Sequence, residues 1–134
     1  LDNSFRNRLT AMLIYDPTRV LGSSTTLAQA LNFEVPANDG YTERVPIPFS
    51  SPQEDGAKGL IVGNIIEFSA NTEQFAITDV GIILDGTTTI GDGTGVLYSF
   101  HPIAKGMAVT LYPQQSYFFR LDINQYGYTR KVQG

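Results

Sequence analysis

Residues 75–85 read Phe-Ala-Ile-Thr-Asp-Val-Gly-Ile-Ile-Leu-Asp, and this stretch decides the predicted fold. Side chains that alternate along an extended chain point to opposite faces of a sheet. Apolar residues occupy both alternating sets here, with Ile77 in one set and Val80 and Ile82 in the other. A strand that is apolar on both faces is typical of the centre of a sheet that is covered on both sides. The sequence therefore predicts that residues 75–84 form the central strand.

Further short extended segments precede and follow this strand in the sequence, separated by turns rich in Gly, Pro, Asn and Asp. They are predicted at residues 25–35, 41–49, 63–69, 96–101, 107–112 and 117–124. Pro46 and Pro48 cannot donate backbone hydrogen bonds, so the segment that holds them is predicted to be an edge strand. Strands and turns at this spacing predict an all-β fold: a single antiparallel β-sandwich or jelly roll of about seven to eight strands.

One short helix is predicted near the N-terminus, at residues 4–13. Ser4 is a suitable N-cap, and apolar residues follow from Phe5 at the i, i+4, i+7 and i+8 positions of one helical face. Pro17 disfavours a helical conformation at the residue before it and ends the segment. Because so short a helix needs a surface to dock on, it covers the end of the domain's own core or forms an arm that faces a partner.

The chain is predicted to be one domain with three parts. Residues 1–16 are the N-terminal helix or arm, residues 17–124 the β-sandwich, and residues 125–134 a C-terminal tail. No secretory signal and no apolar run long enough to cross a bilayer are expected.

Composition excludes several classes of function. The 134 residues are 42% hydrophobic and 16% charged, with a net charge of −4 and no cysteine. A core is therefore possible, whereas a disordered chain is not expected. The negative charge argues against nucleic acid as a partner, and without cysteine there is no disulfide, thiolate metal site or cysteine nucleophile.

Residues with the chemistry for catalysis or metal binding are sparse. His101 is the single histidine and is predicted to pack at a strand end. Asp85 and Asp92 offer oxygens to a calcium ion, but Asp-Gly pairs are also selected by hairpin turns alone. The glycines of residues 91–95 are not followed by Lys and Ser or Thr, so they do not form a phosphate-binding loop. We therefore expect no catalytic residue, no cofactor and no metal, and a protein that is not an enzyme.

The two ends of the chain are predicted to contact partners. Basic residues at both ends flank an acidic body, and tyrosines lie among the C-terminal ones, which suits a strap on a partner's surface. The predicted contact residues are Arg6, Arg8, Tyr126, Tyr128, Arg130 and Lys131. The tail, residues 125–134, is expected to become ordered only against a neighbouring copy or another protein.

The order of these features resembles a family of small structural β-sandwich proteins of tailed bacteriophages. The most specific similarity is the Ile-Thr-x-Val-Gly-Ile strand within residues 75–85. The other similar segments are residues 3–13, 39–45, 47–50, 64–68 and 97–99. The chain departs from the family pattern at residues 15–19, where the family often continues with an aliphatic strand.

The resemblance implies a non-enzymatic protein on the virion exterior, made in the host cytoplasm. Its expected role is capsid decoration as a cement protein, through contacts with copies of itself, as a homo-oligomer, and with a capsid or tail protein. No nucleic acid or membrane partner is expected. The alternative is a minor tail or tail-fibre-associated protein, including a glycan-binding module with a groove of Tyr98, Tyr112 and Tyr117.

Overall fold

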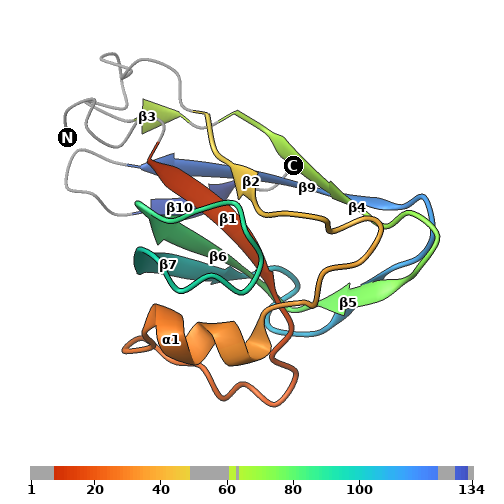
Figure 1. The fold of residues 1–134 in the computed structure, drawn as a ribbon, viewed down its shortest axis with the longest axis horizontal. Helices are drawn as coiled ribbons and strands as arrows, with labels where there is room; N and C mark the ends of the chain where they lie inside the picture. The colour runs from red at the N-terminus through yellow and green to blue at the C-terminus, as the bar shows by residue number, and fades with distance from the viewer. Residues whose placement is uncertain (1–7, 49–60, 63, 124–128, 133–134) are drawn as a thin grey trace.

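The protein is an all-β chain with antiparallel sheets (Figure 1). The computed structural model describes residues 8–48, 61–62, 64–123 and 129–132. Its helices are α1 (Leu27–Ala30) and the 3-10 helix η2 (Leu31–Phe33). Its strands are β1 (Leu9–Ile14), β2 (Val45–Pro46), β3 (Ile61–Val62), β4 (Ile66–Ser69), β5 (Phe75–Ile77), β6 (Asp79–Leu84), β7 (Val96–Pro102), β8 (Val109–Leu111), β9 (Ser116–Ile123) and β10 (Thr129–Val132). No helix of these described residues is long and apolar enough to cross a membrane.

Two sheets form the layers of a sandwich. The first has the strand order β2-β1-β6-β7, and the second has β10-β9-β3, with β4 also paired to β9. In Figure 1 the first sheet lies across the second, and β5, which pairs with β8, extends from one end. Between the layers, Leu13, Val80 and Ile82 of the first sheet belong to the same buried cluster as Phe119 and Leu121 of the second. This cluster is the main core.

The prediction of a central, twice-covered strand is confirmed for β6. It pairs with β1 on one side and β7 on the other. Its second face is covered too, because Ile83 packs with Leu21 and Leu27 of the α1 region in a separate buried cluster. Thr78 divides the predicted segment into β5 and β6, which belong to different sheets.

The prediction of a helix at residues 4–13 is wrong for its described part. Leu9–Ile14 is strand β1, with all six residues buried. Leu13 faces the main core, whereas Met12 and Ile14 face the α1 region. The apolar residues that fit a helical stripe are equally the residues of a strand that is covered on both faces. Pairing with β2 and β6 therefore outweighs the local helical pattern.

The strand predicted at residues 25–35 is also wrong, since α1 and η2 occupy it. Thr26 is the N-cap: its hydroxyl accepts a hydrogen bond from the Gln29 backbone N–H, and the Gln29 side chain accepts one from the Thr26 N–H. This reciprocal pair is a capping box, which the Thr-x-x-Gln spacing would have revealed.

Most of the other strand predictions are confirmed. β4, β7, β8 and β9 fall within or closely match the predicted segments. Segment 41–49 contains β2, which is an edge strand as its prolines require, although only two of its residues pair.

The prediction that the C-terminal tail has no order of its own is wrong for residues 129–132. They form β10, which pairs antiparallel with β9 along four residues, from Thr129 opposite Ile123 to Val132 opposite Arg120. The tail lacks an alternating pattern of its own, and β9 supplies the hydrogen-bonding edge that makes it a strand. The rest of the predicted tail lies outside the described residues.

Candidate interaction surface

The residues predicted to contact a partner are not brought together in the described structure. Arg6, Tyr126 and Tyr128 lie outside the described residues. Arg8 directly precedes β1, and Arg130 and Lys131 are on β10. Register places the backbone of Arg130 opposite Asp122 and that of Lys131 opposite Leu121.

Arg8 forms an ion pair within the chain. Its Nε and Nη2 donate to Oδ1 and Oδ2 of Asp85 at 2.8 and 2.7 Å. The hydrogen bond from Arg8 lowers the pKa of the Asp85 carboxyl. The two side chains remain 42% and 54% exposed, so the pair contributes little to stability. Arg8 therefore ties β1 to the turn after β6.

An exposed apolar surface lies on the outer face of β9. Phe118 alternates with the core residue Phe119 and is 52% exposed. It pairs with Glu67 of β4, and Ile65, which directly precedes β4, is 61% exposed. We call Ile65, Glu67 and Phe118 the β9 outer patch. Large apolar side chains in such positions are typical of protein contact surfaces.

Beside this patch, hydroxyl and carboxylate groups bind one another. Ser116 donates to Glu67 Oε2 at 2.6 Å, and its Oγ lies 2.7 Å from Ser69 Oγ. Further along β9, Arg120 Nη2 donates to Asp122 Oδ2 at 3.3 Å, and the Asp122 side chain is buried. The patch is therefore bordered by polar groups that already have partners within the chain.

A buried polar cluster lies in the segment between η2 and β2. Arg44 is fully buried and donates through Nε and Nη2 to both oxygens of Glu34, at 2.9 and 2.8 Å. The Tyr41 hydroxyl donates to Glu34 and accepts from the backbone N–H of Leu13. Burial, followed by the nearby Glu34 charge, raises the pKa of Tyr41 strongly.

This cluster also holds the turn between β6 and β7. Glu34 accepts from the Gly91 N–H at 2.8 Å, and the Arg44 N–H donates to the Thr88 carbonyl at the same distance. The sequence did not reveal the cluster, because a charged side chain such as that of Arg44 is rarely buried and carries no local sign of its partner. Its role is to join three segments that are far apart in sequence.

A second buried cluster surrounds the start of β6. Asp79 is buried and accepts two hydrogen bonds from Arg19, at 2.5 and 3.0 Å, which raise the pKa of the arginine. Asp16 accepts from the N–H groups of Val20 and Leu21. Thr78 accepts from the Asp16 N–H and donates to the Ile14 carbonyl. The Thr and the following Asp of the most specific motif thus hold the loop after β1 in place.

Of the two acidic residues considered for calcium, Asp92 makes its contacts within its own turn, and Asp85 pairs with a distant arginine. Asp92 accepts from the hydroxyl of Thr87 and from the N–H and hydroxyl of Thr94, and the Thr87 bond is the main cause of its lowered pKa. Asp85 binds Arg8 as described above. Among the described residues, no group of three or more His, Asp or Glu is arranged to hold a metal ion.

His101 and the three tyrosines predicted to line a glycan groove are dispersed. His101 is half-buried on β7, where its Nε2 lies 3.1 Å from Ser99 Oγ and its ring lies beside Phe119. Tyr98 and Tyr117 pack on the main core from β7 and β9, whereas Tyr112 is 53% exposed after β8. The tyrosines lie on three different segments.

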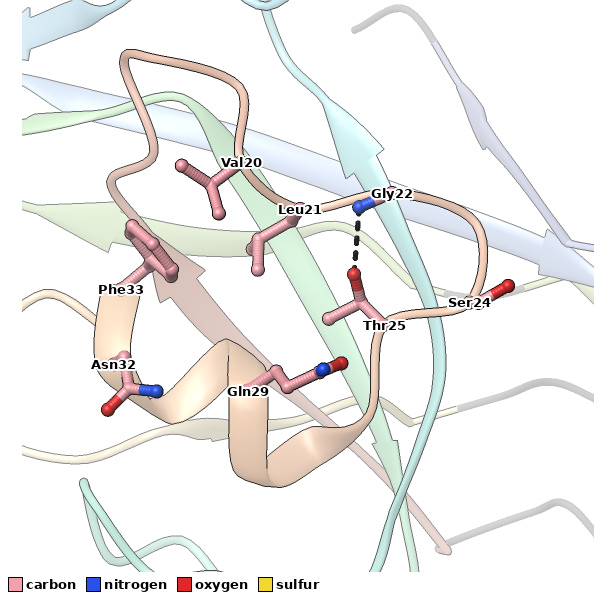
Figure 2. Close-up of a pocket in the computed structure, with 8 residues that line it drawn as sticks. All are labelled: Val20, Leu21, Gly22, Ser24, Thr25, Gln29, Asn32 and Phe33. Carbon is pink, nitrogen blue, oxygen red and sulfur yellow. Dashed lines mark hydrogen bonds between the residues drawn. The ribbon is translucent and has the colours of Figure 1, made fainter.

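Two hollows flank the loop of residues 22–25. The first, of about 360 Å³, lies between this loop and the α1–η2 segment, and Figure 2 shows its lining residues. Leu21 and Phe33 belong to the apolar cluster beneath it, and Gln29 and Asn32 extend from the helical side. The second hollow, of about 430 Å³, lies between the loop and β7.

Comparisons of the whole chain with protein-family models, curated proteins and solved structures gave no match.

Proposed function

We propose that this protein is a non-enzymatic structural protein of a tailed-bacteriophage virion, most simply a cement protein that decorates the capsid. The resemblance of residues 75–85 to the phage family is one support. The contacts of this segment suit a structural motif: Thr78 and Asp79 hold a loop, and Val80 and Ile82 fill the core.

The observation that carries the proposal is that ionisable side chains of the described residues bind partners within the same chain. Arg8, Arg19 and Arg44 are each paired with a carboxylate of the same chain. Asp92 binds hydroxyl and N–H groups of its own turn. Such contacts stabilise a rigid domain, and catalysis instead requires reactive groups gathered in a cavity.

The β9 outer patch is the proposed contact surface. Phe118 and Ile65 offer apolar area on a regular sheet face, and the charged Glu67 lies beside them. A large aromatic residue at the centre with polar groups around it is the usual composition of a protein–protein interface. We propose capsid proteins and further copies of this chain as its partners, on the exterior of the particle.

Labelling of intact particles tests the virion role. Gold-labelled antibody against the purified chain is applied to tailed-phage particles from the strain that encodes it, with antibody absorbed by excess protein as the control. Label over the capsid is expected. Label confined to the tail would replace capsid decoration by the minor tail alternative, and particles without specific label would overturn the virion role.

Rebinding to particles that lack the protein tests the contact surface. Phe118→Asp should reduce attachment at least about tenfold, because it places a charge in an apolar contact. Tyr112→Asp is the matched control, since Tyr112 is equally exposed but lies after β8. Equal attachment of the two variants would remove the β9 outer patch from the proposal.

A further inference from the structure

We propose that the two hollows beside residues 22–25 form a binding site for a neutral saccharide. This inference goes beyond the virion role and does not depend on it. It also differs from the predicted tyrosine groove, because Tyr98 lines one of the hollows whereas Tyr112 and Tyr117 do not.

The two hollows are adjacent parts of one surface. Thr25 lines both, so the two hollows meet at this residue. Their volumes of about 360 and 430 Å³ each fall within the range of small-molecule sites. Adjacent hollows of this size suit two consecutive rings of an oligosaccharide.

The lining chemistry matches a sugar. A sugar ring has an apolar C–H face and a rim of hydroxyl groups, so it requires both an apolar floor and hydrogen-bonding groups. Leu21 and Phe33 provide the floor of the first hollow, and Leu97 and Phe100 line the second. Hydroxyl and amide groups complete the lining, from Ser23, Ser24, Thr25, Gln29, Asn32, Tyr98 and Ser99.

The absence of charge selects against other ligands. No Asp, Glu, Lys, Arg or His is among the described residues that line the two hollows. A phosphate, a carboxylate or a metal ion would lose part of its hydration there without gaining a counter-charge, which is unfavourable. A neutral polyhydroxyl ligand meets no such penalty.

Several hydrogen-bonding groups of the site are available to a ligand. Within the described part of the chain, the side chains of Ser23, Ser24 and Asn32 make no hydrogen bond. The oxygen of Gln29 is used by the capping box, which leaves its amide N–H groups as donors. Similarly, Thr25 accepts from the Gly22 N–H and keeps its hydroxyl proton for donation.

The framework around the site is held in place without a ligand. Asp16 fixes Val20 and Leu21 through their N–H groups, and the capping box fixes the start of α1. Leu21 and Leu27 are buried on the outer face of the first sheet. Preorganisation of this kind reduces the entropy cost of binding.

An NMR titration of the intact protein tests the inference. The probes are glucose, galactose, mannose and N-acetylglucosamine, with sialic acid as the anionic comparison and an array of immobilised neutral oligosaccharides as a separate arm. A neutral sugar is expected to cause saturable shifts of backbone amides confined to residues 20–33 and 97–100. Saturation by free hexoses identifies a single-ring ligand, whereas binding on the array alone identifies a longer surface glycan.

Variants separate this site from adventitious binding. Gly22 lines the first hollow, and a Cβ there meets no atom within 4 Å, so Gly22→Trp should leave the chain folded, and its large side chain beside the hollow should obstruct binding. Asn32→Ala should weaken binding about three- to tenfold, the loss of one neutral hydrogen bond. Thr42→Trp, at an exposed position outside the site, is the control and should bind normally.

The outcomes are decisive in either direction. No saturable shift with any neutral sugar in both arms would overturn the inference, as would shifts located elsewhere or unaffected by Gly22→Trp. Preference for sialic acid would also overturn it, because an anion contradicts the uncharged lining.

Discussion

Gly81 shows how one residue sets the spacing within the central sheet. It is the register partner of Met12, and a Cβ at this position would lie 2.8 Å from Met12 Cγ and 3.0 Å from Ile14 Cδ1. We expect Gly81→Val to lower the free energy of unfolding by about 1–3 kcal/mol, the usual cost of overpacking a core. Urea denaturation followed by circular dichroism measures this change.

Two variants control the Gly81 experiment. Gly22→Ala introduces a Cβ into open space and should change stability by less than about 0.5 kcal/mol. In a Met12→Ala background the Gly81→Val cost should shrink, because the nearest atoms have been removed. A cost that is unchanged in that background would show that Met12 is not what the new side chain meets.

Tyr41 makes stability depend on pH in the alkaline range. Its pKa is raised above the ordinary value of 10.0, chiefly by burial, so the unfolded chain loses this phenolic proton before the folded chain does. The contribution of the neutral phenol is therefore complete below pH 10 and is lost as the pH rises above it. Wild type should lose up to about 1.4 kcal/mol per pH unit more than Tyr41→Phe above pH 10.

The measurement compares urea unfolding of wild type and Tyr41→Phe from pH 8 to above pH 10. Tyr41→Phe is less stable at pH 8, because it lacks the hydrogen bonds to Glu34 and Leu13, and the gap should narrow above pH 10. Tyr112→Phe, at an exposed position, should keep a constant difference from wild type. A gap for Tyr41→Phe that stays constant would mean that the hydroxyl ionises equally in both states.

At the scale of elements, part of the C-terminal tail is a strand of the domain, β10. Its four residues pair with β9, whose Leu121 and Ile123 are buried in the main core. Deletion of residues 125–134 should therefore lower the free energy of unfolding by about 2 kcal/mol or more, since several backbone hydrogen bonds are lost. Thermal unfolding of the truncated and complete chains measures it.

The matching control deletes only residues 133–134, which follow β10 and should be dispensable for its pairing. If the truncation at residue 124 instead leaves the melting temperature unchanged, the pairing of β10 contributes nothing to the isolated domain. The tail would then act only as a strap for a partner.

The pattern of buried and exposed residues in each element explains which elements could be predicted from the sequence. β4 alternates between buried and exposed residues, and β9 does so at Phe118 and Phe119, so period-2 patterning identified them. β1 is apolar on both faces, and its pattern does not distinguish a strand from a helix. α1 was identifiable only from its capping box, because its four residues are too few to show a period.

At the scale of the whole molecule, carboxylates that accept hydrogen bonds within a turn or from a distant segment make the fold sensitive to acid. Hydrogen bonds from Thr72, Arg8 and Thr87 lower the pKa values of Asp39, Asp85 and Asp92 below 3.8. Their contributions are present above pH 3.8 and are lost as the pH falls through the lowered values. The urea midpoint should therefore be nearly constant from pH 7 to about pH 5 and fall below about pH 4.

Asp85→Asn should reduce this fall by a small amount, because the amide does not titrate and the exposed pair with Arg8 contributes little to stability. Glu43→Gln is the control, at an exposed carboxylate that makes no hydrogen bond within the described residues. An acid transition that is identical in wild type and Asp85→Asn would show that the pairing with Arg8 does not contribute to it.

The sequence by itself determined the all-β class and the central position of residues 79–84, because alternation and apolar content are local properties of the chain. It also determined that Pro46 lies on an edge, since a proline has no N–H to donate to a second neighbour. Only the tertiary structure decided that Leu9–Ile14 is a strand, that Arg44 is buried against Glu34 and that residues 22–25 separate two hollows. Each of these features depends on segments that are distant along the chain, and their contact free energies do not appear in any local pattern.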